Sequence, residues 1–436
     1  MSSEVLEHSL ASLCLLVADC PHATPEWTAS GVVVLRNQNI KGGRLDLSAP
    51  SFTDEAHYLG RIRRAAPQEG DLVITREAPM GEVCQIPAGL KCCLGQRQVL
   101  LRPDPEKVDS RFLLYALQSP YLQHQIGWNE GTGSTVSNLR IPVLEALKVP
   151  TPSVATQREV ASVLGALDDR ITLLRETNAT LEAITQALFK SWFVDFDPVR
   201  AKAEGRQPEG MDATTAALFP DSFEESELGL VPKGWRWAAL ADAYEMNPAR
   251  KLKKGEVAPY LDMSSAPTSG HCSEAYVQRE MGSGAKFTNG DTLLARITPC
   301  LENGKSAFVD FLDDGQNGWG STEFIVLRPK APLPEYHGYL LARHTQFRDF
   351  AVQCMSGTSG RQRIQNDMLG RFLLALPTES VANAFSDFVM PIQKSITANH
   401  KQAQTLGLLR DTLLPRLISG QLRLPDAEHA VEEALA

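Results

Sequence analysis

The stretch TQREVASVLGALDDRITLLRETNATLEAITQALFKSWF, residues 156–193, decides the fold of this chain. Its apolar residues recur at alternating steps of four and three, which is the spacing of a coiled-coil seam. The seam positions are Val160, Leu164, Leu167, Ile171, Leu174, Asn178, Leu181, Thr185, Leu188 and Trp192. A single helix of this length would extend about 57 Å, so one small domain cannot enclose it. We therefore expect a long helical rod that needs a partner.

A second rod is predicted over residues 379–419, again with steps of mostly three and four. Its seam positions are Phe385, Phe388, Ile392, Ile396, Asn399, Ala403, Leu406, Leu409, Leu413 and Leu417. Each seam has one asparagine near its middle, Asn178 or Asn399, and a buried polar residue there fixes the register of a helix pair. We expect the two rods to pair antiparallel. The alternative for each rod is an amphipathic helix packed on its own domain.

Length and composition describe a soluble globular protein of two or three domains. The chain has 436 residues, 43% of them hydrophobic and 22% charged. No apolar run approaches about 20 residues, and the N-terminus lacks the basic region and cleavage site of a signal peptide. The eight cysteines show neither a CxxC pair nor zinc-ligand spacing, which indicates reduced thiols and a cytoplasmic protein.

The net charge of −9 argues at first against a nucleic-acid partner. Eight acidic residues, however, lie in a linker and in the tail: Asp221, Glu224, Glu225, Glu227, Asp426, Glu428, Glu432 and Glu433. The remaining body is close to neutral. Between residues 36 and 64 basic side chains are in excess, namely Arg36, Lys41, Arg44, Arg61, Arg63 and Arg64. This segment could contact phosphates, although a solvated loop would show the same pattern.

An internal repeat organises the globular parts of the chain. Short strand-like runs at 31–40, 71–76, 81–86 and 97–103, followed by a helix at 110–126, predict a mixed α/β domain with a curved sheet. The same phrases return after Trp235. The pairs are GDLVITR (70–76) with GDTLLAR (290–296), RQVLLRP (97–103) with EFIVLRP (323–329), GTGSTVSNL (131–139) with SGTSGRQRI (356–364), and LKVPTP (147–152) with LALPTE (374–379).

The chain is thus predicted to be a duplicated unit of one globular domain and one rod, of mixed α/β (α+β) class. The expected segments are a first globular domain at 1–152, the first rod at 153–195, a connection at 196–234, a second globular domain at 235–378, the second rod at 379–424 and an acidic tail at 425–436. The tail is expected to be disordered.

No catalytic motif emerges from the sequence. Gly304-Lys305-Ser306 resembles the end of a phosphate-binding loop, but Pro299 occupies the position of its first glycine. Asn247-Pro248-Ala249-Arg250 lacks the second proline and the aromatic residue that an amino-methyltransferase would place against a flipped base. Neither HExxH, GxSxG nor an EF-hand pattern is present. We therefore expect no active site on this chain.

A duplicated domain without chemistry, carried on paired helices, suits recognition of two sites at a fixed separation. DNA presents half-sites about 34–36 Å apart on one face of the duplex. Loops rich in Gly, Ser, Thr and Asn can hydrogen-bond phosphates and base edges, and Arg and Gln suit bidentate base contacts. For each loop taken alone, plain connection is the alternative.

Four phrases resemble the conserved helical regions of specificity subunits of Type I restriction-modification systems. They are LFKSWFVDFDPVRAKAEG (188–205), LFPDSFEESELGLVPKGW (218–235), LLPRLISGQL (413–422) and TQREVASVLGALDDRI (156–171). The resemblance extends over essentially the whole chain. It departs at the helix openings, where the family has Glu-Gln and this chain has Thr156-Gln157 and Glu379-Ser380.

The resemblance implies two target recognition domains in inverted orientation, each reading one half of a bipartite sequence in double-stranded DNA. It further implies that the helices dock two methyltransferase subunits, which carry S-adenosylmethionine and methylate adenine N6. A translocase/nuclease subunit using ATP and Mg would complete the restriction complex. On this interpretation the chain itself binds no cofactor and no metal, is not an enzyme, and has no membrane partner.

Candidate DNA contacts fall in both domains. In the first they are Arg36, Asn37, Gln38, Asn39, Lys41, Arg76, Gln96, Thr132, Ser134, Thr135 and Ser137. In the second they are Arg296, Asn303, Lys305, Ser321, Thr322, Ser356, Thr358, Ser359, Arg361 and Gln362. The candidates for the subunit interface are Leu188, Phe189, Trp192, Phe193, Phe196, Leu413, Leu414 and Leu417. Turn chemistry explains the first two sets equally well, and packing within the rod pair explains the third.

Two other classes of function stay open at this point. One is a coiled-coil scaffold or adapter that joins proteins without sequence-specific DNA binding. The other is a standalone enzyme such as a methyltransferase, which binding of S-adenosylmethionine by the purified chain would support.

Overall fold

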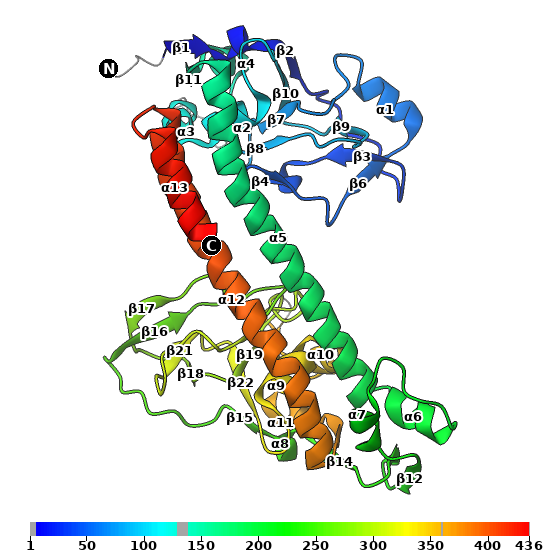
Figure 1. Cartoon of the computed structure of the whole chain (residues 1–436). Helices are drawn as coiled ribbons and strands as arrows, with labels where there is room; N and C mark the ends of the chain where they lie inside the picture. Colours follow the sequence, from blue (N-terminus) through cyan, green and yellow to red (C-terminus); the bar gives the residue numbers. More distant parts are fainter. Residues whose placement is uncertain (1–5, 129–137, 359–360, 436) are drawn as a thin grey trace. The chain divides into compact units, whose positions relative to one another are not determined.

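The computed structural model describes residues 6–128, 138–358 and 361–435 and divides into two compact units (Figure 1). Unit 1 comprises residues 1–172 and 404–436, and unit 2 comprises residues 173–403. Two helices of 40 residues each, α5 (Val154–Phe193) and α12 (Glu379–Ile418), contribute one part to either unit. The two predicted rods are therefore confirmed as continuous helices.

Unit 1 is built on a four-stranded antiparallel sheet in the order β2-β10-β7-β8. A second sheet has the order β6-β3-β9, in which β3 and β9 run parallel. Apolar side chains of both sheets, among them Leu35, Val73 and Leu100, form one buried cluster. The strands are β1 (Leu6–Ser9), β2 (Cys14–Asp19), β3 (Val32–Leu35), β4 (Ile40–Lys41), β5 (Arg44–Leu45), β6 (Ser51–Thr53), β7 (Leu72–Thr75), β8 (Val83–Gln85), β9 (Cys92–Leu94), β10 (Gln98–Pro103) and β11 (Lys148–Thr151). The shorter helices are η1 (Leu10–Leu13), η2 (Asn37–Asn39), α1 (Glu55–Arg61), α2 (Ser110–Gln118), α3 (Pro120–Trp128), α4 (Ile141–Ala146) and α13 (Leu424–Leu435).

Unit 2 repeats this plan with a larger aromatic core. Its sheets have the orders β15-β22-β19-β20 and β17-β16-β21-β18, and β16 and β21 run parallel. The strands are β12 (Phe223–Ser226), β13 (Gly229–Pro232), β14 (Arg236–Ala239), β15 (Tyr244–Met246), β16 (Val257–Leu261), β17 (Val277–Glu280), β18 (Ala285–Phe287), β19 (Thr292–Ala295), β20 (Ser306–Phe308), β21 (Gly318–Gly320), β22 (Phe324–Pro329), β23 (Met355–Ser356), β24 (Arg363–Ile364) and β25 (Leu373–Leu376). The shorter helices are α6 (Asp197–Ala203), α7 (Ala213–Ala217), α8 (Leu240–Ala243), α9 (Glu335–Arg343), α10 (Thr345–Gln353) and α11 (Asn366–Leu369).

The two units share one topology, which confirms the internal repeat. The sheet β2-β10-β7-β8 corresponds to β15-β22-β19-β20, and the parallel pair β3–β9 corresponds to β16–β21. In each unit an antiparallel pair, β1–β11 or β14–β25, immediately precedes a long helix. The predicted mixed α/β fold is also confirmed, since each unit combines β-sheets with α-helices.

The long helices pair antiparallel within each unit, as predicted. In unit 2 the Asn399 amide donates to the Asn178 side-chain oxygen at 2.9 Å, while Trp192 contacts Phe385 with ring centroids 5.5 Å apart. In unit 1 the Arg410 guanidinium contacts the Asp168 carboxylate at 2.7 Å. Residue numbers thus rise on one helix as they fall on the other. One seam prediction is wrong, because the Phe388 side chain is 44% exposed.

Three local predictions are corrected by the structure. The helix predicted at 110–126 is two helices, α2 and α3, because Pro120 cannot supply the backbone N–H that a continuous helix requires. The strand predicted at 31–40 ends at Leu35, and a short 3-10 turn follows. The tail predicted to be disordered contains helix α13, whose Ala427 and Val431 are buried.

Candidate nucleic-acid interface

Arg76 directly follows β7, and its side chain and backbone hold the chain at Leu139. Its backbone N–H donates to the Arg97 carbonyl at 2.8 Å, and its Nε donates to the Leu139 carbonyl at 2.9 Å. The Leu139 N–H returns a bond to the Arg76 carbonyl at 2.9 Å. A salt bridge of 3.0 Å to Asp19 holds the other end of the guanidinium. Arg76 therefore joins three chain segments at one edge of the sheet.

Arg296 occupies the equivalent place at the end of β19. Its N–H donates to the Glu323 carbonyl at 2.9 Å, and its Nη2 donates to the Ile364 carbonyl at 2.9 Å. The Ile364 N–H donates to the Arg296 carbonyl at 2.8 Å. The two arginines that the sequence selected are thus brought to matching positions. Both are engaged in the fold, so contact of either with DNA stays a prediction.

In unit 1 the turn after β3 carries the candidates Arg36, Asn37, Gln38, Asn39 and Lys41. Asn37 donates to the Glu77 carbonyl at 2.5 Å, and Arg36 lies over the Trp27 ring at 5.4 Å. Gln38 and Lys41 are exposed. Asn39 differs, because it is buried and both polar atoms of its amide bind the backbone of the turn, at Arg36 and at Asp46. Its side chain serves the turn itself.

The remaining candidates divide into exposed and internally bonded residues. Gln96 is exposed and donates to the His22 carbonyl at 2.5 Å. Lys305 donates to the carbonyls of Met263 and Ser264 at 2.6 and 3.1 Å, which pins the 262–265 turn. The Ser321 hydroxyl accepts from the Glu323 N–H at 3.2 Å. The exposed set comprises Asn303, Thr322, Ser356, Thr358 and Arg361.

Gln362 lies beside β19, since its N–H donates to the Thr298 hydroxyl at 3.1 Å. It thus joins Arg296 and Arg361 at the strand ends of unit 2. Thr132, Ser134, Thr135, Ser137 and Ser359 lie outside the described residues.

Sequence reasoning missed two arginine–glutamate pairs at these edges. In unit 1, Arg97 Nε lies 3.2 Å from Glu77, and Asn138 donates to the same carboxylate at 2.6 Å. In unit 2, Arg363 binds Glu323 through both Nε and Nη2, at 3.0 and 2.7 Å. The hydrogen bond from Arg363 holds the pKa of Glu323 below its usual value, so this glutamate is ionised. The repeated phrases RQVLLRP and EFIVLRP begin with Arg97 and Glu323. Charged residues at the same place in both repeats were the feature of the sequence that could have pointed to the pairs.

Most of the predicted interface residues lie in the interior of their own unit. Phe189, Trp192, Phe193 and Phe196 belong to the aromatic core of unit 2 and are at most 6% exposed. In unit 1 Leu413, Leu414 and Leu417 are buried as well. Packing within the chain accounts for their apolar character, and their contact with a partner stays a prediction.

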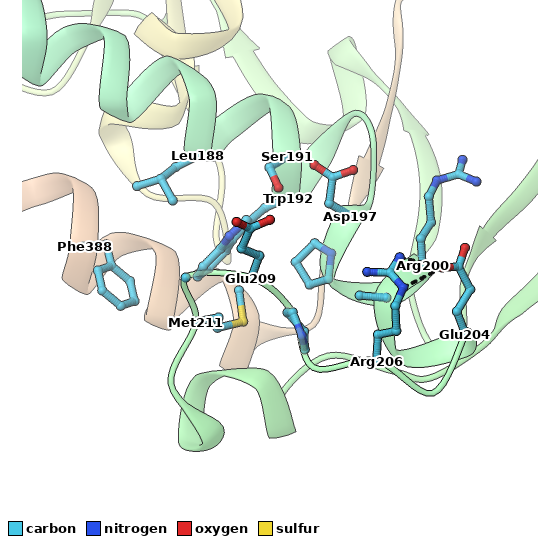
Figure 2. Close-up of a pocket in the computed structure, with 14 residues that line it drawn as sticks. Leu188, Ser191, Trp192, Asp197, Arg200, Glu204, Arg206, Glu209, Met211 and Phe388 are labelled. Atoms are coloured by element: carbon cyan, nitrogen blue, oxygen red, sulfur yellow. Dashed lines mark hydrogen bonds and ion pairs between the residues drawn. The ribbon is translucent and has the colours of Figure 1, made fainter.

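A cavity of about 530 Å³ lies in unit 2 where the first long helix ends. In Figure 2 the apolar side chains of Leu188, Met211 and Phe388 gather at one end, and Arg200, Glu204 and Arg206 gather at the other. Trp192 forms part of the wall. Leu188 is half-buried, so among the predicted interface residues it is the one that reaches the surface at this cavity.

Metal and membrane chemistry find no support in the part of the chain that the structure describes. Across residues 6–128, 138–358 and 361–435, no cluster of three or more His, Cys, Asp or Glu side chains could hold a metal ion. None of the described helices is long and apolar enough to cross a membrane.

Comparison with known proteins finds a family model that matches part of the chain. Residues 31–183 match the model of the Type I restriction modification DNA specificity domain. The match covers β3 to the first part of α5, so it includes the Arg76 clamp and the Arg97–Glu77 pair.

Curated relatives extend the likeness over most of the chain. The Type I restriction enzyme MjaIX specificity subunit of Methanocaldococcus jannaschii is 24% identical over 82% of this chain and 79% of its own length. The Type I restriction enzyme HindI specificity subunit of Haemophilus influenzae is 25% identical over 67% of this chain and 73% of its own length. The resemblance inferred from the sequence is confirmed. Both relatives are named specificity subunits, which agrees with the prediction that this chain is not itself an enzyme.

A solved structure shows the same fold. The S subunit of a Type I restriction-modification system from M. genitalium superposes with a TM-score of 0.54 at 16% sequence identity. The superposition covers 94% of this chain and 95% of the other. At this identity the likeness concerns the fold alone.

Proposed function

We propose that the chain reads a bipartite target in double-stranded DNA, one half through residues 1–152 and the other through residues 235–378. The duplicated framework carries this proposal. At the strand ends of each unit an arginine, Arg76 or Arg296, holds a neighbouring segment, and an arginine–glutamate pair lies beside it. Residues 31–183, which lie in unit 1 and the first long helix, match a DNA specificity domain model. Polar groups at such loop and strand ends can contact phosphates and base edges.

The partners would be two methyltransferase subunits and a restriction/translocase subunit. S-adenosylmethionine, ATP and Mg would act on these partners, and this chain would supply recognition without catalysis. The surface around the unit 2 cavity supports docking, because the Phe388 ring is 44% exposed beside Leu188 and Met211. An exposed aromatic beside a concave apolar surface is typical of protein interfaces. A complex that acts on cellular DNA would be cytoplasmic.

The test is to co-express the chain with a Type I methyltransferase subunit from the same source in a methylation-free host. N6-methyladenine is then mapped across the host DNA at base resolution. A bipartite motif with a fixed gap is the expected result. A stable complex that methylates nothing, together with no salt-sensitive DNA binding by that complex, would favour the protein scaffold instead, since phosphate contacts make affinity fall with salt.

A further inference from the structure

One exposed arginine in each unit is braced by a glutamate at the ends of the central strands. The Arg363 Nε lies 3.0 Å from both oxygens of Glu323, and its Nη2 lies 2.7 Å from one of them. The Arg97 Nε lies 3.2 Å from Glu77. The arginine side chains are 44% and 57% exposed, whereas each glutamate side chain is 22% exposed. In both pairs the acid lies deeper and the guanidinium faces solvent.

The two pairs share one position of the common topology, and their second residues, Glu77 and Arg363, come from different segments. The carbonyls of Arg97 and Glu323 accept the N–H groups of Arg76 and Arg296, so Arg97 and Glu323 are equivalent. Arg363 directly precedes the clamped Ile364, as Asn138 precedes the clamped Leu139. Unit 1 thus has its arginine where unit 2 has its glutamate. A pair that serves only the framework would keep its residues in the same positions.

With respect to the described residues, the geometry of the Arg363 brace leaves one edge of the guanidinium available to a ligand. Glu323 takes the edge formed by Nε and one N–H of Nη2. The end of the guanidinium, with Nη1 and the second N–H of Nη2, has the parallel donors that match O6 and N7 of guanine in the major groove. A fixed side chain also loses less conformational entropy on binding.

We propose that Arg97 and Arg363 each read a guanine, one in each half of the target, with Glu77 and Glu323 as positioning residues. This inference rests on the proposed function and adds the base that each domain recognises. A bidentate contact distinguishes guanine from another base by roughly 5- to 150-fold. The two arginines therefore act as specificity determinants, in contrast to phosphate contacts, which strengthen binding to every sequence.

The experiment compares methylation motifs of complexes that contain the wild-type chain, Arg97→Ala or Arg363→Ala. Each variant is expected to lose the guanine preference at one position, in a different half of the motif, while the other half stays unchanged. Glu323→Gln should keep the guanine but slow methylation, because the guanidinium loses its ionic brace. Arg371→Ala removes another exposed arginine of unit 2 and serves as the matched control, with an unchanged motif and rate.

Arg363→Lys separates base reading from phosphate binding. Lysine retains the positive charge but lacks the planar fork. If Arg363 reads guanine, lysine should fail to restore the preference. An unchanged motif in both alanine variants, or full rescue by lysine, would overturn the inference and leave the proposed function intact. A wild-type complex without any motif would overturn both.

Discussion

Two polar clusters connect the long helices to the globular parts of the two units, and they differ in chemistry. In unit 1 the acid lies on the long helix, where Asp168 of α5 accepts from Tyr115, Arg410 and Arg44 at 2.7, 2.7 and 3.1 Å. In unit 2 the acid lies on the domain, where Asp310 accepts from Gln393 and Thr397 of α12 at 2.6 and 2.5 Å. Asp310 also lies 3.2 Å from the His271 Nε2. The unit 1 cluster thus uses two guanidinium groups and a phenol, whereas the unit 2 cluster uses an amide, a hydroxyl and an imidazole.

The equivalent helices α2 and α9 also differ at one buried position, where one carries an apolar ring and the other a titratable ring. Phe112 and His337 both stand third in the equivalent helices α2 and α9, and both are buried. His337 accepts or donates a 2.5 Å bond with the Tyr244 hydroxyl and packs against Phe189 and Phe193. The duplicated topology therefore constrains where apolar volume must lie. It leaves the polar groups of each junction free to differ. A substitution at one junction should therefore change the stability of one unit and leave the other unchanged.

The largest expected effect comes from the aromatic cluster of unit 2. Phe385 is fully buried, with ring centroids 4.7 Å from Phe193 and 5.5 Å from Trp192. Phe385→Ala should lower the free energy of unfolding of unit 2 by about 3–5 kcal/mol, because the surroundings cannot fill the cavity. Hydrogen exchange should show weakened amide protection in unit 2 and little change in the sheet of unit 1.

Phe388→Ala is the matched control for this variant. Its ring contacts the same Trp192 at 6.0 Å but is 44% exposed. A loss below about 1 kcal/mol is expected for a surface site of this kind. Equal loss of protection in both units on Phe385→Ala would contradict the separation of the two cores.

A slightly smaller effect is expected at the ionic junction of unit 1. Asp168→Ala removes the acceptor of two guanidinium groups and one phenol, and breaking such a partly buried network should cost about 3 kcal/mol. The melting temperature of unit 1 should fall by about 6–12 °C. The neighbouring Asp169→Ala should cost below about 1 kcal/mol, since its side chain is 70% exposed. Similar falls in the melting temperature for Asp168→Ala and Asp169→Ala would show that the partly buried network around Asp168 does not stabilise unit 1.

The pH dependence of the two units should differ because burial lowers the pKa of His337 to about 3. The unfolded chain binds this proton near pH 6.5, whereas the folded chain resists it. Stability is therefore complete above pH 6.5 and falls as the pH decreases toward 3. By pH 5 the loss should be about 2 kcal/mol, at about 1.4 kcal/mol per pH unit.

His337→Phe places the unit 1 residue in unit 2 and should remove this part of the pH dependence. The measurement is the urea midpoint of unit 2 between pH 7.5 and 5, for the wild type and the variant. An identical decline in the two proteins would mean that other groups cause it.

The sequence predicted the long helices and the repeat because both depend on apolar spacing, which is a local property. It did not predict the break at Ser119–Pro120, although Pro120 was visible, because the apolar spacing continued across it. The arginine–glutamate pairs could not be derived, since Arg363 and Glu323 are joined only when β19 and β22 bring the loop end beside them. The exposure of Phe388 could not be predicted either. Periodicity shows which face of a helix is apolar, but not which residues cover that face.

The smallest expected effect concerns the asparagine pair, which lies only in the unit 2 part of the long helices among the described residues. Asn178→Leu leaves the Asn399 amide without its 2.9 Å acceptor and should cost about 1 kcal/mol. The double variant Asn178→Leu, Asn399→Leu removes both amides and should recover this loss, because leucine suits a helix seam. A double-mutant cycle by urea unfolding measures the coupling between the two positions. Recovered stability together with an altered gap in the methylation motif would show that the two asparagines set the register of the helix pair. Additive losses of stability would show that the two amides act independently.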